Sequence, residues 1–198
     1  MVKLAQPQQF PAQERTIVEK AYPGDIIGLF DPGIFGIGDS LSDEKLKLTF
    51  EDFPVFPPEI FARVQPRDSL KRKQFEKGIL QLSQEGAIQI FNQKHVGLES
   101  FVVGVVGQLQ LEVLEYRLQN EYNAQLIMTA LPFTVARWVY AEDPRAIESL
   151  RGLDNGMLVY DKNDRPVILV NNEWALNWIL QRNQGLEFLT VPPDKARV

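Results

Sequence analysis

The chain has 198 residues, 44% of them hydrophobic, which is enough for one or two domains with a substantial core. Its net charge of -5 and isoelectric point near 5.0 argue against the broad basic surface of a nonspecific nucleic-acid binder. No long apolar run and no charged-then-apolar leader occurs, so we expect neither a membrane span nor a signal peptide. The lack of cysteine excludes disulfides and thiolate metal sites and fits a cytoplasmic protein, and one histidine, His95, leaves little for zinc or imidazole catalysis.

The first fifty residues are punctuated by glycine and proline. Pro23-Gly24-Asp25 and similar turns separate short runs of β-type composition. These runs predict strands over residues 2–5, 16–19, 26–30 and 46–50, and the stretch 26–30 is apolar enough to be a buried strand. Such dense turns favour a small β barrel, but three or four strands are too few to close one. We therefore expect residues 1–52 to be part of a barrel.

The hydrophobic pattern is clearest over residues 60–129, after a stiff, proline-rich linker at residues 53–59. Apolar residues alternate over 60–65 and then recur at helical spacing from residue 69 to about residue 84. Two β-rich runs, 87–91 and 101–106, are followed by a second helical pattern and a strand over 124–129. The order β-α-β-β-α-β is that of the split βαβ or ferredoxin-like motif. It predicts an α+β fold in which a four-stranded sheet carries both helices on one face.

The ends of these two helices carry capping residues. Asp68 or Ser69 can accept hydrogen bonds from the first-turn N–H groups, and Gly86 can take the left-handed conformation at the C-terminus. The second helix starts at Gly107, and its apolar stripe consists of Leu111, Leu114, Leu118 and Tyr122. Both helices are therefore expected to bury one face against the sheet.

The last region, residues 133–198, repeats the same element order with less apolar content. A strand is predicted over 134–140, a short helix after Asp143-Pro144, and a hairpin of strands 157–160 and 166–170 around the polar turn 161–164. Asn171 or Asn172 caps a helix that carries Trp174 and Trp178, and a strand over 186–191 follows. We expect a smaller α+β segment packed on the central unit.

Nucleotide-binding patterns are absent or better explained by turns. The chain has no Gly-x-x-x-x-Gly-Lys-Ser/Thr phosphate loop. Asp25-Ile26-Ile27-Gly28 spells Asp-x-x-Gly but fits a turn, the polar stretch 161–164 fits a hairpin turn, and Gly104-Val105-Val106-Gly107 fits a strand-to-helix turn. These stretches predict local structure rather than a nucleotide site.

One charge feature stands out near the start of the first helix. Lys73 and Lys77 are one helical turn apart, and the cluster as a whole consists of Arg67, Lys71, Arg72, Lys73 and Lys77. Cations at a helix N-terminus oppose the helix dipole, so they do not serve helix stability. Two interpretations stay open: a solvated helix face, and a patch that contacts phosphate groups.

Several stretches resemble the peptide chain release factor 3 family of translational GTPases. They include Tyr-Pro-Gly-Asp-Ile-Ile-Gly at 22–28, Arg-Lys-Gln-Phe-Glu-Lys-Gly at 72–78, Gly-Val-Val-Gly-Gln-Leu-Gln at 104–110 and Ala-Arg-Trp-Val at 136–139. The resemblance is dense over residues 6–139 and continues in pattern beyond them. It implies that residues 1–52 are the end of an elongation-factor-like barrel (domain II). Residues 53–132 would then be a domain like domain III of elongation factor G, and residues 133–198 a C-terminal segment.

The resemblance also implies a function. Members of the family bind the ribosome with GTP and promote the departure of stop-codon-reading, class 1 release factors. GTP and magnesium would belong to a GTPase domain that this chain lacks, so the chain itself is expected to have no cofactor, no metal and no catalytic residue. It would contact ribosomal RNA and ribosomal protein, in the cytoplasm and not at a membrane. We expect a monomer, although a cut barrel would expose residues 26–30 and would favour low solubility or a dimer through them.

A second hypothesis is a stand-alone enzyme with a carboxylate site in a cleft between the central unit and the last segment. Glu112, Glu115 and Asp164 are its candidate acid and base residues. Acids alone, without cysteine and with one histidine, offer few nucleophile or metal partners. A structure in which these acids converge in a dry pocket would favour this hypothesis.

Overall fold

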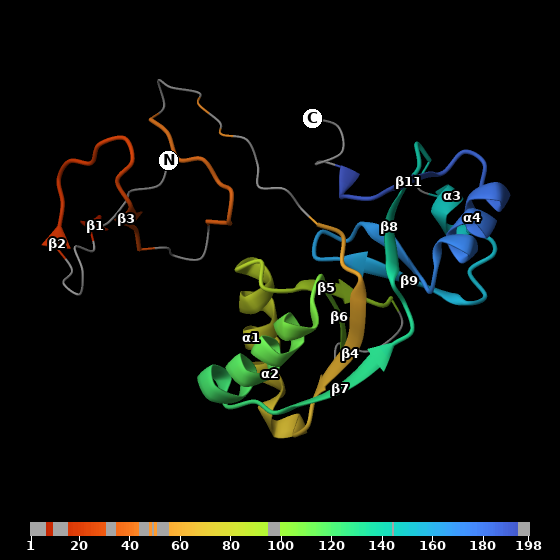
Figure 1. Ribbon diagram of the computed structural model, residues 1–198, viewed down its shortest axis with the longest axis horizontal. Coiled ribbons are helices and arrows are strands. Elements are labelled where there is room, and N and C mark those ends of the chain that lie inside the picture. The colour runs from red at the N-terminus through yellow and green to blue at the C-terminus, as the bar shows by residue number, and fades with distance from the viewer. Residues whose placement is uncertain are drawn as a thin grey trace. The chain divides into compact units, whose positions relative to one another are not determined.

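The computed structural model describes residues 7–9, 16–30, 35–43, 48, 50, 56–94, 100–143 and 145–193. The chain divides into two compact units, Met1–Glu51 and Asp52–Val198. Each unit is described by itself, and the second contains the larger sheet and the helices (Figure 1).

The first unit contains a small antiparallel sheet with the strand order β2-β1-β3. Its strands are two residues each: β1 Gln8–Gln9, β2 Thr16–Ile17 and β3 Ile27–Gly28. The predicted strand at 2–5 lies outside the described residues, and Leu48 and Phe50, the described residues of the predicted strand 46–50, are not in a strand. The expected turn is present, because Tyr22 N–H donates to the Asp25 carboxylate at 2.8 Å and Gly24 has φ +97°.

The prediction of a buried strand over residues 26–30 is wrong. Only Ile27–Gly28 is in a strand, and Ile26 and Phe30 are 83% and 73% exposed. No residue among those described in this unit is fully buried. An apolar strand is buried only when a second layer packs on it, and composition cannot supply that layer.

The second unit contains one antiparallel sheet of eight strands, in the order β11-β8-β10-β9-β5-β6-β4-β7. The strands are β4 Ile60–Pro66, β5 Gln89–Asn92, β6 Phe101–Val105, β7 Leu126–Leu131, β8 Val135–Tyr140, β9 Gly156–Asp161, β10 Pro166–Val170 and β11 Glu187–Leu189. The helices are η1 Ser69–Lys71, α1 Arg72–Gln84, α2 Gln108–Tyr122, α3 Arg145–Glu148 and α4 Glu173–Arg182. The unit is therefore a mixed α+β structure, as its element order predicted.

Helices α1 and α2 cover the same face of strands β4 to β7 (Figure 1). Their buried residues meet those of the strands in one cluster, which includes Phe75, Ile79 and Leu82 of α1 and the predicted stripe of α2. Gly78 allows the close approach of the two helices, because a Cβ there would lie 2.5 Å from a methyl group of Leu118. The amphipathic patterns therefore place both helices correctly.

The predicted capping residues act at both ends of the helical segment 69–84, but Asp68 caps the η1 turn, and Lys71, the N-cap of α1 itself, makes no side-chain capping bond. The Asp68 carboxylate accepts from Leu70 N–H at 2.9 Å. At the other end Gly86 has φ +73°, and Ala87 N–H and Gly86 N–H donate to the carbonyls of Leu82 and Ser83. This pair of bonds is a Schellman motif, which satisfies two of the free carbonyl groups at the helix end.

The four-stranded sheet expected from the sequence is one half of the eight-stranded sheet. The two halves join where β5 pairs with β9, with Phe91 opposite Asp161 and Asn92 opposite Tyr160. In the second half, α4 packs through Leu176 and Ile179 on one face of β8 and β10. The other face contributes to a cluster shared with the first half, formed by Phe61, Phe91, Val102, Phe133, Ala136, Trp138, Val159, Val167 and Leu169.

Candidate functional site

The basic cluster predicted from the sequence lies where the chain leaves β4 and enters α1. Arg67 N–H donates to the carbonyl of Gln125 at 2.9 Å, so the sheet fixes the start of this segment. Asp68 then caps the short η1 turn that leads into the helix. No acidic residue occupies the first turn of α1, whose charged residues are Arg72 and Lys73.

The structure divides the cluster into differently placed side chains. Lys73 and Lys77 are exposed on the side of α1 opposite its buried residues, and no carboxylate of the described residues forms an ion pair with either. Arg72 instead pairs with Glu76, with Nε and Oε1 2.7 Å apart. Lys71 is half-buried and Arg67 is exposed. Lys73 and Lys77 thus share the outer side of α1, and with Arg67 they are the exposed members of the cluster.

The sequence Gly104-Val105-Val106-Gly107 forms a strand-to-helix turn, as expected. Gly104 is buried within β6, and Gly107 is the N-cap of α2. The side chain of Gln110 closes the turn by accepting from the N–H groups of Val106 and Gly107 at 2.9 and 3.0 Å. Neither glycine therefore presents an open phosphate loop.

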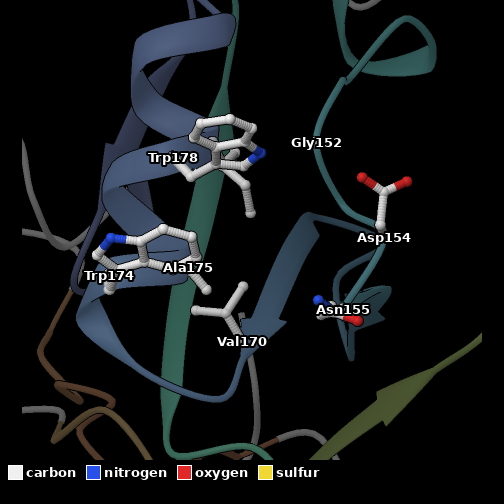
Figure 2. A pocket seen from close by; sticks show the side chains of 9 residues that line it. Gly152, Asp154, Asn155, Val170, Trp174, Ala175 and Trp178 are labelled. Atoms are coloured by element: carbon white, nitrogen blue, oxygen red, sulfur yellow. The ribbon is translucent and has the colours of Figure 1, made fainter.

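The three acids of the enzyme hypothesis do not form a pocket together. Glu112 and Glu115 are exposed on α2, and Asp164 is exposed in the turn between β9 and β10. A pocket of about 240 Å³ lies beside α4, and none of the three acids lines it (Figure 2). Among the described residues no group of three or more histidines or carboxylates is placed to hold a metal ion, and no helix there has the length and apolar content to cross a membrane.

Sequence reasoning missed a buried polar network around Asp161. The carboxylate accepts from Trp138 Nε1 at 2.9 Å and from Arg165 Nε at 2.7 Å, and also from the backbone N–H groups of Asn163 and Arg165. The one available signal was that a tryptophan inside a strand needs an acceptor for its indole N–H. The network fixes the β9–β10 turn that the sequence did predict.

A second network missed by the sequence joins α1 to α2. Arg117 bonds Glu85 at 2.5 Å and Glu121 at 2.7 Å. The hydrogen bond from Arg117 lowers the pKa of Glu121, and its two acidic partners, Glu121 first, raise the pKa of Arg117. Burial, followed by the charge of Glu85, raises the pKa of Tyr122. The ion pairs of Arg117 therefore join α1 to α2, and they do not involve Lys73 or Lys77.

Comparison with known proteins decides the family. The family model described as "Class II release factor RF3, C-terminal domain" matches residues 50–180. The model described as "Elongation factor G domain 2" matches residues 1–44. The chain belongs to the peptide chain release factor 3 family. The resemblance inferred from the sequence motifs is therefore confirmed, and the chain corresponds to the C-terminal part of the family.

Curated relatives in this family match almost the whole chain. Identity is 48% over 94% of the chain for peptide chain release factor 3 of Symbiobacterium thermophilum, 44% over 96% for that of Listeria welshimeri and 40% over 98% for that of Nostoc punctiforme. The chain spans 35% of the length of each of these relatives. A solved structure from Thermus thermophilus matches 72% of this chain and 23% of its own, at 15% identity and a TM-score of 0.49.

Proposed function

We propose that this chain is the C-terminal region of a GTP-dependent translation termination factor. The whole factor would bind the ribosome and promote the release and recycling of the stop-codon-reading release factors. The observation that carries this proposal is the family match over residues 50–180. The chain would act in the cytoplasm, where translation takes place.

Within the factor, this region would be a docking module without catalysis of its own. GTP and magnesium would be bound by the GTPase domain, for which the chain has no Gly-x-x-x-x-Gly-Lys-Ser/Thr loop. Its partners would be ribosomal RNA, ribosomal protein and, through the whole complex, the class 1 release factors. We expect the chain to be a monomer.

The proposed domain plan has three parts: the end of an elongation-factor-like barrel at 1–52, a split βαβ domain at 53–132, and a C-terminal α+β segment at 133–198. The strand order β7-β4-β6-β5, with α1 and α2 on one face, supports a ferredoxin-like middle part. Such a unit holds α1 rigidly and would present its outer face to a partner.

We further propose that the basic cluster contacts the ribosome through Lys73 and Lys77, while Arg67, Lys71 and Arg72 add to the positive potential around them. Lysines without an acidic partner can neutralise phosphates, and this contribution to binding falls steeply with salt. The double variant K73E/K77E tests the contact. Its matched control is K20E/K162E, which reverses two exposed lysines elsewhere in the chain.

Binding to purified 70S ribosomes is measured by cosedimentation over a series of salt concentrations. We expect K73E/K77E to weaken binding about tenfold or more and to reduce the slope of log affinity against log salt by about 1 to 2. The control variant should bind like the native chain. Equal binding by all three proteins would leave only the solvated-face interpretation of the cluster.

The claim that the region is not catalytic has its own test. Isothermal titration of the chain with GTP and magnesium should give no saturable heat. A tight complex of one GTP per chain would refute the docking-module proposal, whatever the ribosome assay shows.

A further inference from the structure

Helix α4 exposes two tryptophans that its core does not need. Trp174 is 73% exposed and Trp178 is 41% exposed, and their rings stack with centroids 6.0 Å apart and planes inclined by 15°. The buried face of the helix uses Leu176 and Ile179 instead. A large aromatic patch left in water is an uncommon feature in a folded domain and marks an interaction surface.

The two rings border the pocket beside α4. Figure 2 shows α4 on one side and the chain at Gly152, Asp154 and Asn155 on the other. The lining is mainly apolar, with polar groups from Asp154 and Asn155, and consists of Gly152, Asp154, Asn155, Gly156, Val170, Trp174, Ala175, Trp178 and Ile179. At about 240 Å³ the pocket is smaller than a typical cofactor or drug site and matches a single side chain.

Local contacts hold the pocket walls in place. The side chain of Asn183 accepts from Arg151 N–H at 2.9 Å and donates to the carbonyls of Arg151 and Ile179 at 2.9 and 2.7 Å. These bonds tie the wall segment to the end of α4. Gly152, with φ +82°, lies so close to Trp178 that a Cβ would be 3.4 Å from the indole. A preformed site of this kind loses little conformational entropy on binding.

The pocket offers a cation one carboxylate and an exposed indole face. Asp154 is exposed, supplies the carboxylate of the lining, and has no ion pair with a basic side chain of the described residues. Indole rings attract cations to their faces. The guanidinium of Arg182 lies 3.1 Å from the ring centroid of Trp178, which also stacks on Trp174, so the indole face left for a partner is that of Trp174. A nucleobase would stack on the same rings, but its phosphates would meet Asp154 on a chain of net charge -5.

We propose that this pocket binds a lysine or arginine side chain on a basic segment of a partner protein. The aliphatic stem would lie along Ala175 and the indole rings of α4, and the charged head would reach the Asp154 carboxylate on the opposite wall. The inference does not rest on the proposed function, because it is argued from the pocket alone.

Nuclear magnetic resonance of the indole N–H groups tests the inference, because the chain has three tryptophans and one is an internal reference. Trp138 is 2% exposed and bonds Asp161, so its signal should stay fixed. The full chain is titrated with pentalysine, and the signals of Trp174 and Trp178 should shift and saturate. Pentalysine acetylated at every side chain should give no such shift.

The variants D154N and W174A should each raise the dissociation constant of pentalysine about three- to fivefold, because an exposed ion pair or cation–π contact is modest. E115Q removes the same charge from the exposed face of α2 and should change nothing. Both altered residues of the pocket are exposed, and an unmoved Trp138 signal reports that each variant is folded.

Several outcomes would overturn the inference. One is the absence of indole shifts up to about 10 mM pentalysine, a concentration that reveals even a weak site. Equal shifts with the acetylated peptide would show that charge is not recognised. Equal weakening by D154N and E115Q would show only long-range attraction. Saturable shifts with oligouridylate but not with pentalysine would assign the pocket to single-stranded RNA.

Discussion

Replacement of Asp161 by asparagine should destabilise the second unit more than any surface change in the same hairpin. Asp161 is 6% exposed and accepts from the buried indole of Trp138 and from Arg165 through one carboxylate oxygen, Oδ2. Its other oxygen, Oδ1, accepts from two backbone N–H groups of the turn. Asparagine keeps one acceptor oxygen and replaces the other with an NH2 group, which can only donate.

The magnitude follows from the groups left without partners. If the amide oxygen keeps the two backbone bonds, the NH2 group faces Trp138 Nε1 and Arg165 Nε, and the buried indole loses its acceptor. An unsatisfied buried donor costs about 1–3 kcal/mol. The side chain of Arg165 is 23% exposed, so water reduces the cost of its lost ion pair to about 1 kcal/mol. We expect D161N to lower the free energy of unfolding by about 2–4 kcal/mol.

Urea unfolding followed by tryptophan fluorescence measures this loss. All three tryptophans lie in the unit Asp52–Val198, so the signal reports on the unit that contains the change. The matched control is D164N in the same turn. Asp164 is exposed with φ +57°, a conformation that asparagine adopts readily, so the control should change stability by less than about 0.5 kcal/mol. A loss below about 1 kcal/mol for D161N would refute the assignment of Asp161 as the acceptor that Trp138 requires.

Two further predictions concern the helix layer. G78A should lower the free energy of unfolding in urea by about 1–2 kcal/mol, because overpacking against Leu118 exceeds the gain of roughly 1 kcal/mol in helix propensity; a more stable variant would show that this leucine moves away without cost. In the variant R117A, the free energy of unfolding should fall less steeply as the pH is lowered into the acid range. Arg117 lowers the folded-state pKa of Glu121 below its ordinary value of 4.5, so its stabilisation is present above that pH and is lost as the pH falls through the folded-state pKa; an unchanged dependence on pH would contradict this.

The elements that sequence analysis located correctly are those set by local chemistry. Asp68 caps the η1 turn that leads into α1, Gly86 ends α1, and Asn172 caps α4 through a bond to Ala175 N–H. Each involves residues within a few positions of one another, so the sequence contains both partners. The apolar stripe of α2 could also be predicted, because a helix with one buried face repeats its apolar residues every three or four positions.

The candidate sites were predicted less completely. The sequence grouped five cations near the start of α1, but only the fold separates the exposed Lys73 and Lys77 from Arg72, which pairs with Glu76. The pocket beside α4 was not predicted at all. Its walls come from residues about twenty positions apart, Asp154 and Trp174, and no spacing rule connects a loop to a helix at that distance.

By itself, the sequence determined the family, the order of strands and helices in the second unit, and the ends of the main helices. These follow from motifs, from hydrophobic period and from caps, all of which act over a few residues. Only the tertiary structure decided that β5 pairs with β9 to make one sheet of eight strands, and that Ile26 and Phe30 stay exposed while Asp161 is buried. Which strands pair at their edges, and which side chains are buried, depends on segments that are distant in the sequence and pack against them. No local stretch of chain contains that information.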